Sequence, residues 1–201
     1  MDKLLALIAE ISAEDEEDVV IQFLCAAWSE MSLELRLGVT INHSEQRVWD
    51  VYCGDVFTYN LDDEGAFSLE LTDDHPLLWE FKYESALAYF TGVPVDADAA
   101  VGALYQAHEN SVGSWIRFGH HLNGAQDLSR LLAGGHGLLA DAPIPLLALY
   151  KKTLAEHGVD VIWNRTYRSK PAGDRHLQVL LMGSSYIVGE GWAAKEVSQP
   201  R

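Results

Sequence analysis

A strict alternation of apolar and polar side chains between residues 33 and 41 constrains the fold more than any other feature of this chain. The odd positions are apolar, namely Leu33, Leu35, Leu37, Val39 and Ile41. The even positions are Glu34, Arg36, Gly38 and Thr40. Because successive side chains of a strand point to opposite faces, this period of two predicts a strand with one buried and one solvated face.

The residues that follow predict further strands of the same kind. Trp49, Val51 and Cys53 share one face of a second strand, and a bulge or bend is expected at residues 54–55. Alternation resumes through residues 57–61, a turn follows at 62–65, and a returning strand is expected over 67–71. Residues 31–83 therefore predict an antiparallel meander with one acidic, solvated face.

Helix patterns flank this meander. Residues 1–30 predict two helices, one capped by Asp2 and one by Ser12, with the acidic run 14–18 in the first turn of the second. Residues 84–158 predict a helical middle, with helices at 84–90, after a cap at Asp96, at 128–133 and at 143–157.

Strand patterns return at residues 159–192, over 159–163, 177–182 and 186–188. The whole chain, residues 1–201, is predicted to be a single α+β domain. The last strands either join the first sheet or form a second layer. If they join it, basic residues would neutralise part of its acidic face: Arg165, Arg168, Lys170 and Arg175.

Negative charge is concentrated in the first half of the chain. Residues 1–100 carry 22 Asp and Glu against four Lys and Arg, whereas residues 101–201 carry eight against ten. A surface of this charge repels nucleic acid and anionic membranes, so neither is expected as a partner. The two cysteines, Cys25 and Cys53, form no disulfide framework, and the N-terminus lacks the basic start of a signal peptide, so a cytoplasmic location is expected.

Aromatic residues lie among these acids and would supply affinity for a basic protein, while the charge would steer the encounter. The expected strands and turns of one sheet carry the candidate partner-binding residues, which are Asp50, Tyr52, Asp55, Asp62, Asp63, Glu64, Glu70, Asp73 and Asp74.

Histidines offer the main alternative chemistry. His108 lies on the apolar stripe of its expected helix, which favours a hydrogen-bonded core histidine. His120 and His121 are adjacent, so both could face one metal ion only on an irregular backbone. Cys53 lies on the apolar face of a strand, where a thiol is unreactive. No metal, cofactor or catalytic residue is predicted.

In its size, its negative net charge and its expected α+β fold class, the chain resembles the small acidic immunity proteins that bacteria pair with secreted toxins. This resemblance implies a non-catalytic protein that neutralises a basic protein partner. Two alternatives remain open: a self-associating structural protein that forms a homo-oligomer, and a small hydrolase-like enzyme. The enzyme would use carboxylates together with histidines, namely His75, His108, His120 and His121.

Overall fold

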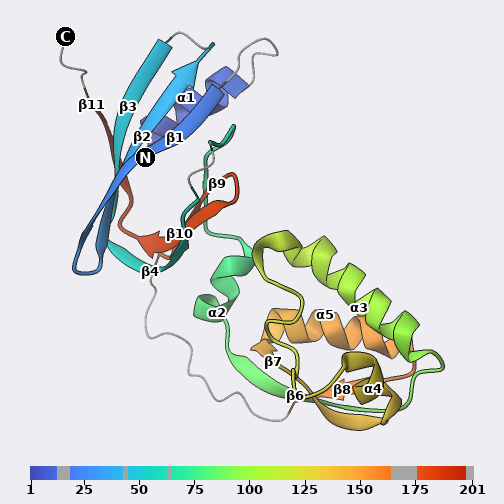
Figure 1. Ribbon diagram of the computed structural model, residues 1–201. Helices are drawn as coiled ribbons and strands as arrows, with labels where there is room; N and C mark the ends of the chain where they lie inside the picture. The colour runs from blue at the N-terminus through green and yellow to red at the C-terminus, as the bar shows by residue number, and fades with distance from the viewer. Residues whose placement is uncertain (13–18, 43–44, 63–64, 164–175, 198–201) are drawn as a thin grey trace. The chain divides into compact units, whose positions relative to one another are not determined.

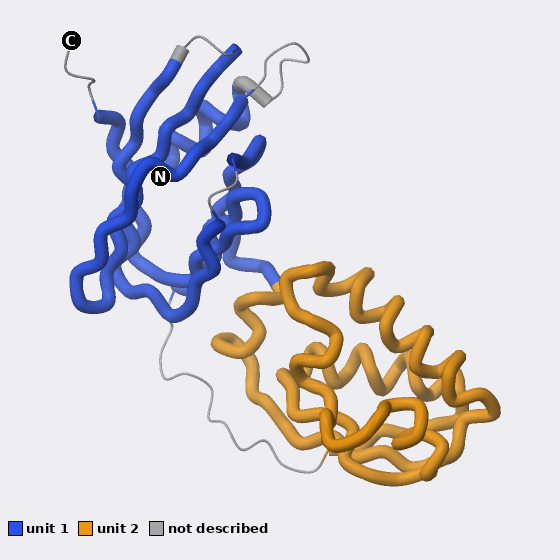
Figure 2. The backbone as a smooth tube through the Cα atoms, in the orientation of Figure 1, with its two compact units in different colours: residues 1–75, 174–201 blue, residues 76–173 orange. Residues whose placement is uncertain are grey.

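The chain folds as two units, and the first of them is assembled from both ends of the sequence (Figure 2). The computed structural model describes residues 1–12, 19–42, 45–62, 65–163 and 176–197. Unit 1 comprises residues 1–75 and 174–201, and unit 2 comprises residues 76–173. Antiparallel sheets and helices make up the fold, so the predicted α+β class is confirmed. One domain over residues 1–201 stays a prediction.

The first sheet of unit 1 has the strand order β1-β2-β3-β11 (Figure 1). Its strands are β1 (Val19–Ser29), β2 (Ser32–Ile41), β3 (Glu45–Cys53) and β11 (Ala193–Val197). The alternation that predicted β2 is confirmed, because all five of its odd-numbered apolar side chains are buried. Trp49, Val51 and Cys53 of β3 are buried beside them, as expected.

The second sheet of unit 1 has the order β4-β10-β9-β5. Its strands are β4 (Asp55–Asn60), β10 (Ser185–Glu190), β9 (Gln178–Met182) and β5 (Glu70–Thr72). The predicted continuous meander is therefore wrong after β3. The chain leaves the first sheet at Gly54, β4 pairs with β10, and the returning strand is reduced to three residues that pair with β9.

The position where the chain changes sheets depends on a close approach between Cys53 and Gly189. A Cβ atom on Gly189 would lie 2.6 Å from the Asp55 carbonyl oxygen and closer still to Cys53 Sγ. The register of β10 against β4 also shifts between Val188 and Gly189. Only a residue without a side chain fits at Gly189, so this glycine allows β4 to begin beside β10.

The N-terminal helix α1 (Asp2–Ser12) is confirmed, and it buries Leu4 and Ile8 against the core of unit 1. The predicted second helix, and with it a fully helical N-terminus over residues 1–30, is wrong, because residues 19–29 form β1. Strand β1 pairs with β2 along its length, apart from a bulge between Phe23 and Cys25. Cross-strand pairing outweighs the helix propensity of its central Leu-Cys-Ala-Ala run. The acidic run 14–18 lies outside the described residues.

Unit 2 contains a three-stranded antiparallel sheet of order β7-β6-β8. Its strands are β6 (Ser85–Thr91), β7 (His136–Pro143) and β8 (Asp160–Ile162). The helix predicted over residues 84–90 is wrong, because this segment is β6. Buried Ala86, Ala88 and Phe90 alternate with exposed Leu87 and Tyr89, a period of two that alanine-rich composition concealed.

The remaining helices of the predicted middle are confirmed. They are α3 (Ala97–Val112), α4 (Leu128–Ala133) and α5 (Ile144–Ala155), accompanied by the short η1 (Pro76–Leu78), α2 (Trp79–Lys82) and η2 (Gly113–Trp115). The Asp96 carboxylate caps α3, as predicted, by accepting a hydrogen bond from the Ala99 amide at 3.0 Å.

The sequence left open whether the last strands join the first sheet or form a second layer, and the structure gives a different answer for different strands. β11 joins the first sheet, β9 and β10 complete the second, and β8 belongs to unit 2. The four basic residues of the 165–175 segment, Arg165, Arg168, Lys170 and Arg175, lie outside the described residues. In the described ranges, no helix has both the length and the apolar composition needed to cross a membrane.

Replacing Gly189 by alanine should lower the free energy of unfolding by about 2–3 kcal/mol, because the new methyl group overlaps Cys53 and the Asp55 carbonyl. At Gly102 of α3, the new Cβ would meet no described atom within 4 Å apart from its chain neighbours and the backbone of its own helix, so the same change should instead raise stability by about 0.5–1 kcal/mol. Calorimetric unfolding of both variants measures the difference. A Gly189→Ala protein as stable as the wild type would contradict the close approach.

Candidate functional site

The candidate partner-binding residues lie on unit 1, but not on one continuous sheet. Asp50 and Tyr52 project from the outer face of β3 in the first sheet. The others lie on or beside strands of the second sheet, namely Asp55, Asp62, Glu70, Asp73 and Asp74. Asp63 and Glu64 lie outside the described residues. The expectation that all nine share one sheet is wrong, because β4 and β5 pair with C-terminal strands.

Asp50 is largely neutralised within its own sheet. Arg36, directly opposite on β2, donates from Nε to Oδ1 at 2.7 Å and from Nη2 to Oδ2 at 3.1 Å. Lys195 occupies the opposite position on β11. The hydrogen bond from Arg36 holds the pKa of Asp50 below its ordinary value, against the opposing effect of partial burial. Asp50 therefore offers a partner little uncompensated charge.

Asp62 has a structural role. Its amide donates to Ser185 Oγ at 2.8 Å, and its carboxylate accepts from Ser184 Oγ at 3.3 Å. These bonds join the segment after β4 to the turn between β9 and β10. The predicted residues with exposed side chains are then Tyr52, Glu70, Asp73 and Asp74, while Asp55 is half-buried.

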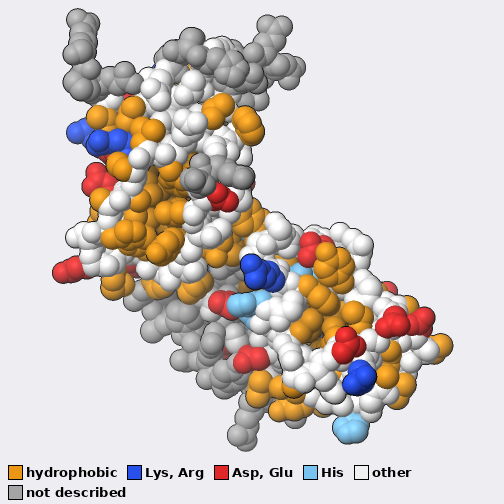
Figure 3. Space-filling model, viewed as in Figure 1, with side chains coloured by type: hydrophobic (Ala, Val, Ile, Leu, Met, Phe, Trp, Pro, Cys, Tyr) orange, Lys and Arg blue, Asp and Glu red, His pale blue; other side chains and the backbone are white. Residues whose placement is uncertain are grey.

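Two exposed aromatic rings contact one another on unit 1 and were missed as a surface feature. Trp28 of β1 and Tyr59 of β4 have ring centroids 4.7 Å apart, although the residues remain 46% and 50% exposed. Met31, in the turn after β1, is 56% exposed. Figure 3 shows hydrophobic side chains gathered on the visible face of unit 1, with charged groups around them. Trp28 escaped notice because its segment was predicted to be helical.

The two units also differ in formal net charge. Unit 1 carries 21 Asp and Glu against six Lys and Arg, a formal balance of −15. Unit 2 carries nine against eight, a balance of −1. Of the 22 acidic residues in positions 1–100, 18 thus belong to unit 1 and four belong to unit 2.

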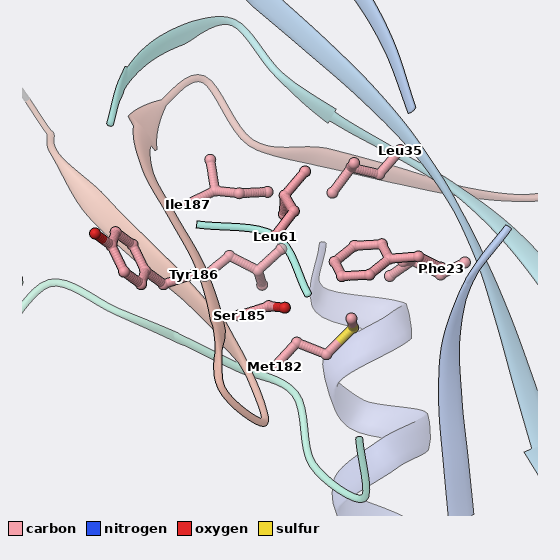
Figure 4. Close-up of a pocket in the computed structure, with 9 residues that line it drawn as sticks. Phe23, Leu35, Leu61, Met182, Ser185, Tyr186 and Ile187 are labelled. Carbon is pink, nitrogen blue, oxygen red and sulfur yellow. The ribbon is translucent and has the colours of Figure 1, made fainter. Parts of the chain in front are cut away.

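The space between the two sheets of unit 1 is a small apolar pocket (Figure 4). Its empty volume is about 200 Å³, and this figure includes space that is open to solvent. Phe23, Leu35, Met182 and Ile187 are among its lining residues. We assign it to the packing of the sheets.

In unit 2, a carboxylate and two imidazoles come together. Glu80 of α2 places Oε1 3.6 Å from His121 Nε2 and 3.8 Å from His120 Nε2. One ligand atom from each residue lies within 4.8 Å of the other two. Glu80 was missed because it lies 40 positions before His120 in the sequence, and nothing in its local sequence distinguishes it from other acids.

The two adjacent histidines converge because their backbone is irregular, which was the condition set from the sequence. The His120 amide donates to the Arg117 carbonyl at 2.8 Å, closing a turn. The His121 carbonyl then accepts from the Asp141 amide at 2.9 Å, which attaches the segment to β7. The two rings meet edge to face, with centroids 4.6 Å apart and an angle of 85° between their planes.

His121 is held by its ring as well as by its main chain. Its Nδ1 lies 3.0 Å from the Asp141 carbonyl oxygen. Its Nε2 is buried and has no hydrogen-bond partner among the residues that the structure describes. Burial, reinforced by the neighbouring His120, lowers the pKa of His121 below its ordinary value, which favours the neutral ring.

His108 is a core histidine, as predicted. It is fully buried, its Nε2 donates to the Ile116 carbonyl at 2.7 Å, and its Nδ1 forms a hydrogen bond with the Tyr150 hydroxyl at 2.8 Å. Both ring nitrogens are thus used, and His108 takes no part in the Glu80–His120–His121 group. His75 is half-buried in unit 1, where burial lowers its pKa.

The buried thiol of Cys53 is poorly suited to nucleophilic chemistry. Burial raises its pKa to about 12, against a smaller opposing effect of the hydrogen bond to the Glu190 carbonyl. A thiol that stays protonated at neutral pH is a weak nucleophile, which agrees with its expected role in packing.

Comparison with known proteins identifies no relative: no family model, no curated protein and no solved structure matches this chain.

Thiol labelling should distinguish the two cysteines. At pH 8, a disulfide reagent should react rapidly with exposed Cys25 and at least about a hundredfold more slowly with Cys53, which is buried and protonated. The Cys25→Ser variant should therefore lose the rapid phase, and Cys53→Ser should keep it. Rapid labelling of the Cys25→Ser protein in its folded state would contradict the assignment of Cys53.

Proposed function

We propose that unit 1 is a non-catalytic binding module for a basic protein, acting in the cytoplasm in the manner of a bacterial immunity protein. The observation that carries the proposal is the exposed Trp28–Tyr59 ring pair on a unit whose formal balance is −15. Aromatic side chains with adjacent apolar surface are the usual anchors of protein interfaces.

The charge of unit 1 supports a basic partner in particular. Exposed carboxylates such as Glu70 and Asp74 contribute to a negative field that accelerates encounter with a positively charged surface. The rings supply the other part of the interaction, because burying an aromatic side chain mainly slows dissociation. Charge and rings should therefore affect different rate constants.

The first test is capture of a partner from a lysate of the source cell at about 50 mM salt, followed by a wash near 500 mM salt, where exposed charge pairs are strongly screened. We expect a basic protein that the wash releases and that the Trp28→Ala variant fails to retain. The proposal would be contradicted if the wild-type protein captured no basic protein, or captured no more of it than the Trp28→Ala variant does. In that event, the molar mass of the protein in solution, measured over a range of protein concentrations, tests the alternative that the chain forms a homo-oligomer.

Reversal of charge should slow association with the captured protein. The double change Glu70→Lys and Asp74→Lys is expected to lower the association rate constant at least about tenfold at low salt and to leave dissociation nearly unchanged. Stopped-flow or biosensor kinetics give both constants.

A matched control carries the same charge change on the nearly neutral unit. Glu84→Lys with Glu156→Lys, two exposed positions of unit 2, should alter association less than about threefold. Equal effects of the two double variants would mean that net charge alone is sensed, and the assignment of the binding face to unit 1 would be wrong.

A further inference from the structure

The Nε2 atom of His121, a hydrogen-bond acceptor in the neutral ring, faces a carboxylate oxygen of Glu80, which is also an acceptor. The Asp141 carbonyl oxygen can only accept a hydrogen bond. His121 Nδ1, which lies 3.0 Å from this oxygen, therefore carries a proton and donates the hydrogen bond. In the neutral ring this leaves a lone pair on Nε2. Within the described part of the chain this atom has no hydrogen-bond partner, and His121 is only 9% exposed. Nε2 faces Glu80 Oε1 at 3.6 Å, and a carboxylate oxygen is also an acceptor. A cation between these two atoms would satisfy both.

We propose that Glu80, His120 and His121 form a binding site for a zinc ion in unit 2. With metal–ligand bonds of about 2.0–2.2 Å, neighbouring ligand atoms of a tetrahedral zinc site lie about 3.4 Å apart. The Glu80 oxygen lies 3.6 Å and 3.8 Å from the two imidazole nitrogens. Small side-chain adjustments would bring the three atoms to coordination distance.

The donor set selects the type of ion. Two imidazole nitrogens with one carboxylate favour zinc and similar divalent transition metals, whereas magnesium and calcium prefer oxygen ligands throughout. Three protein ligands leave a fourth position, as in zinc sites that bind a water molecule. His120 is exposed and the Glu80 side chain is 37% exposed, so solvent can reach this position.

The surroundings of His121 fit the role of a metal ligand. Metal-binding histidines usually donate their other ring nitrogen to a carbonyl or carboxylate, which fixes the tautomer and orients the ring. The Asp141 carbonyl does this here, and the Asp141 amide also binds the His121 carbonyl. The ligand is thus oriented before any ion arrives. The proposal is independent of the partner of unit 1, since all three ligands belong to unit 2.

The test is a titration of the metal-free, full-length protein with zinc chloride in competition with a chromophoric chelator at about pH 7.5. We expect one zinc ion per chain with a dissociation constant at or below about 1 μM. Glu80→Gln and His120→Ala should each weaken binding at least about tenfold, in keeping with the cost of disturbing such sites. Neither side chain is buried, so both variants should fold, and circular dichroism checks this.

The control is His136→Ala, which removes an exposed histidine of unit 2 outside the group. It should leave zinc affinity unchanged within about twofold, and millimolar magnesium should not compete. If Glu80→Gln and His120→Ala bind zinc as tightly as His136→Ala does, or if the wild type binds it only at about millimolar concentration, no such site exists.

Discussion

Unit 1 depends on hydrogen bonds between its first 75 residues and strands from the other end of the chain. Strand β10 separates β4 from β9, and β11 covers the edge of β3. These pairings join residues more than a hundred positions apart, for example Tyr59 with Ile187. They determine which side chains are buried and which acids and rings remain at the surface. The close approach of Cys53 and Gly189 lies where the chain passes from one sheet to the other.

Local patterns predicted the elements whose stability is local or whose burial is regular. The alternation in β2 and the Asp96 cap of α3 are examples, since each is readable within about ten residues. The errors arose where a distant partner decides the outcome. The alanine-rich sequence of β6 predicts a helix, but pairing with β7 and β8 makes the segment a strand. Strand β1 depends on its pairing with β2 in the same way. The meander failed because β4 finds its partner in β10.

The same limitation applies to the candidate sites. Charge counting showed that the acidic residues are concentrated in residues 1–100, but it could not show that Arg36 neutralises Asp50 or that Asp62 binds the β9–β10 turn. It also missed the contact between Trp28 and Tyr59, which come from different sheets. The requirement for an irregular backbone at His120 and His121 was readable from their adjacency. The contribution of Glu80 was not, because only the tertiary fold brings it there.

Taken together, the two units have different chemical characters: an acidic surface with exposed rings on unit 1, and a nearly neutral unit 2 that orients a buried imidazole toward a carboxylate. The orientation of His121 is most directly tested by nitrogen-15 NMR of its imidazole in the metal-free protein. The Nδ1-protonated tautomer is expected, with an unprotonated Nε2 whose resonance shifts when zinc is added. An Nε2-protonated ring, or resonances that zinc leaves unchanged, would contradict this arrangement.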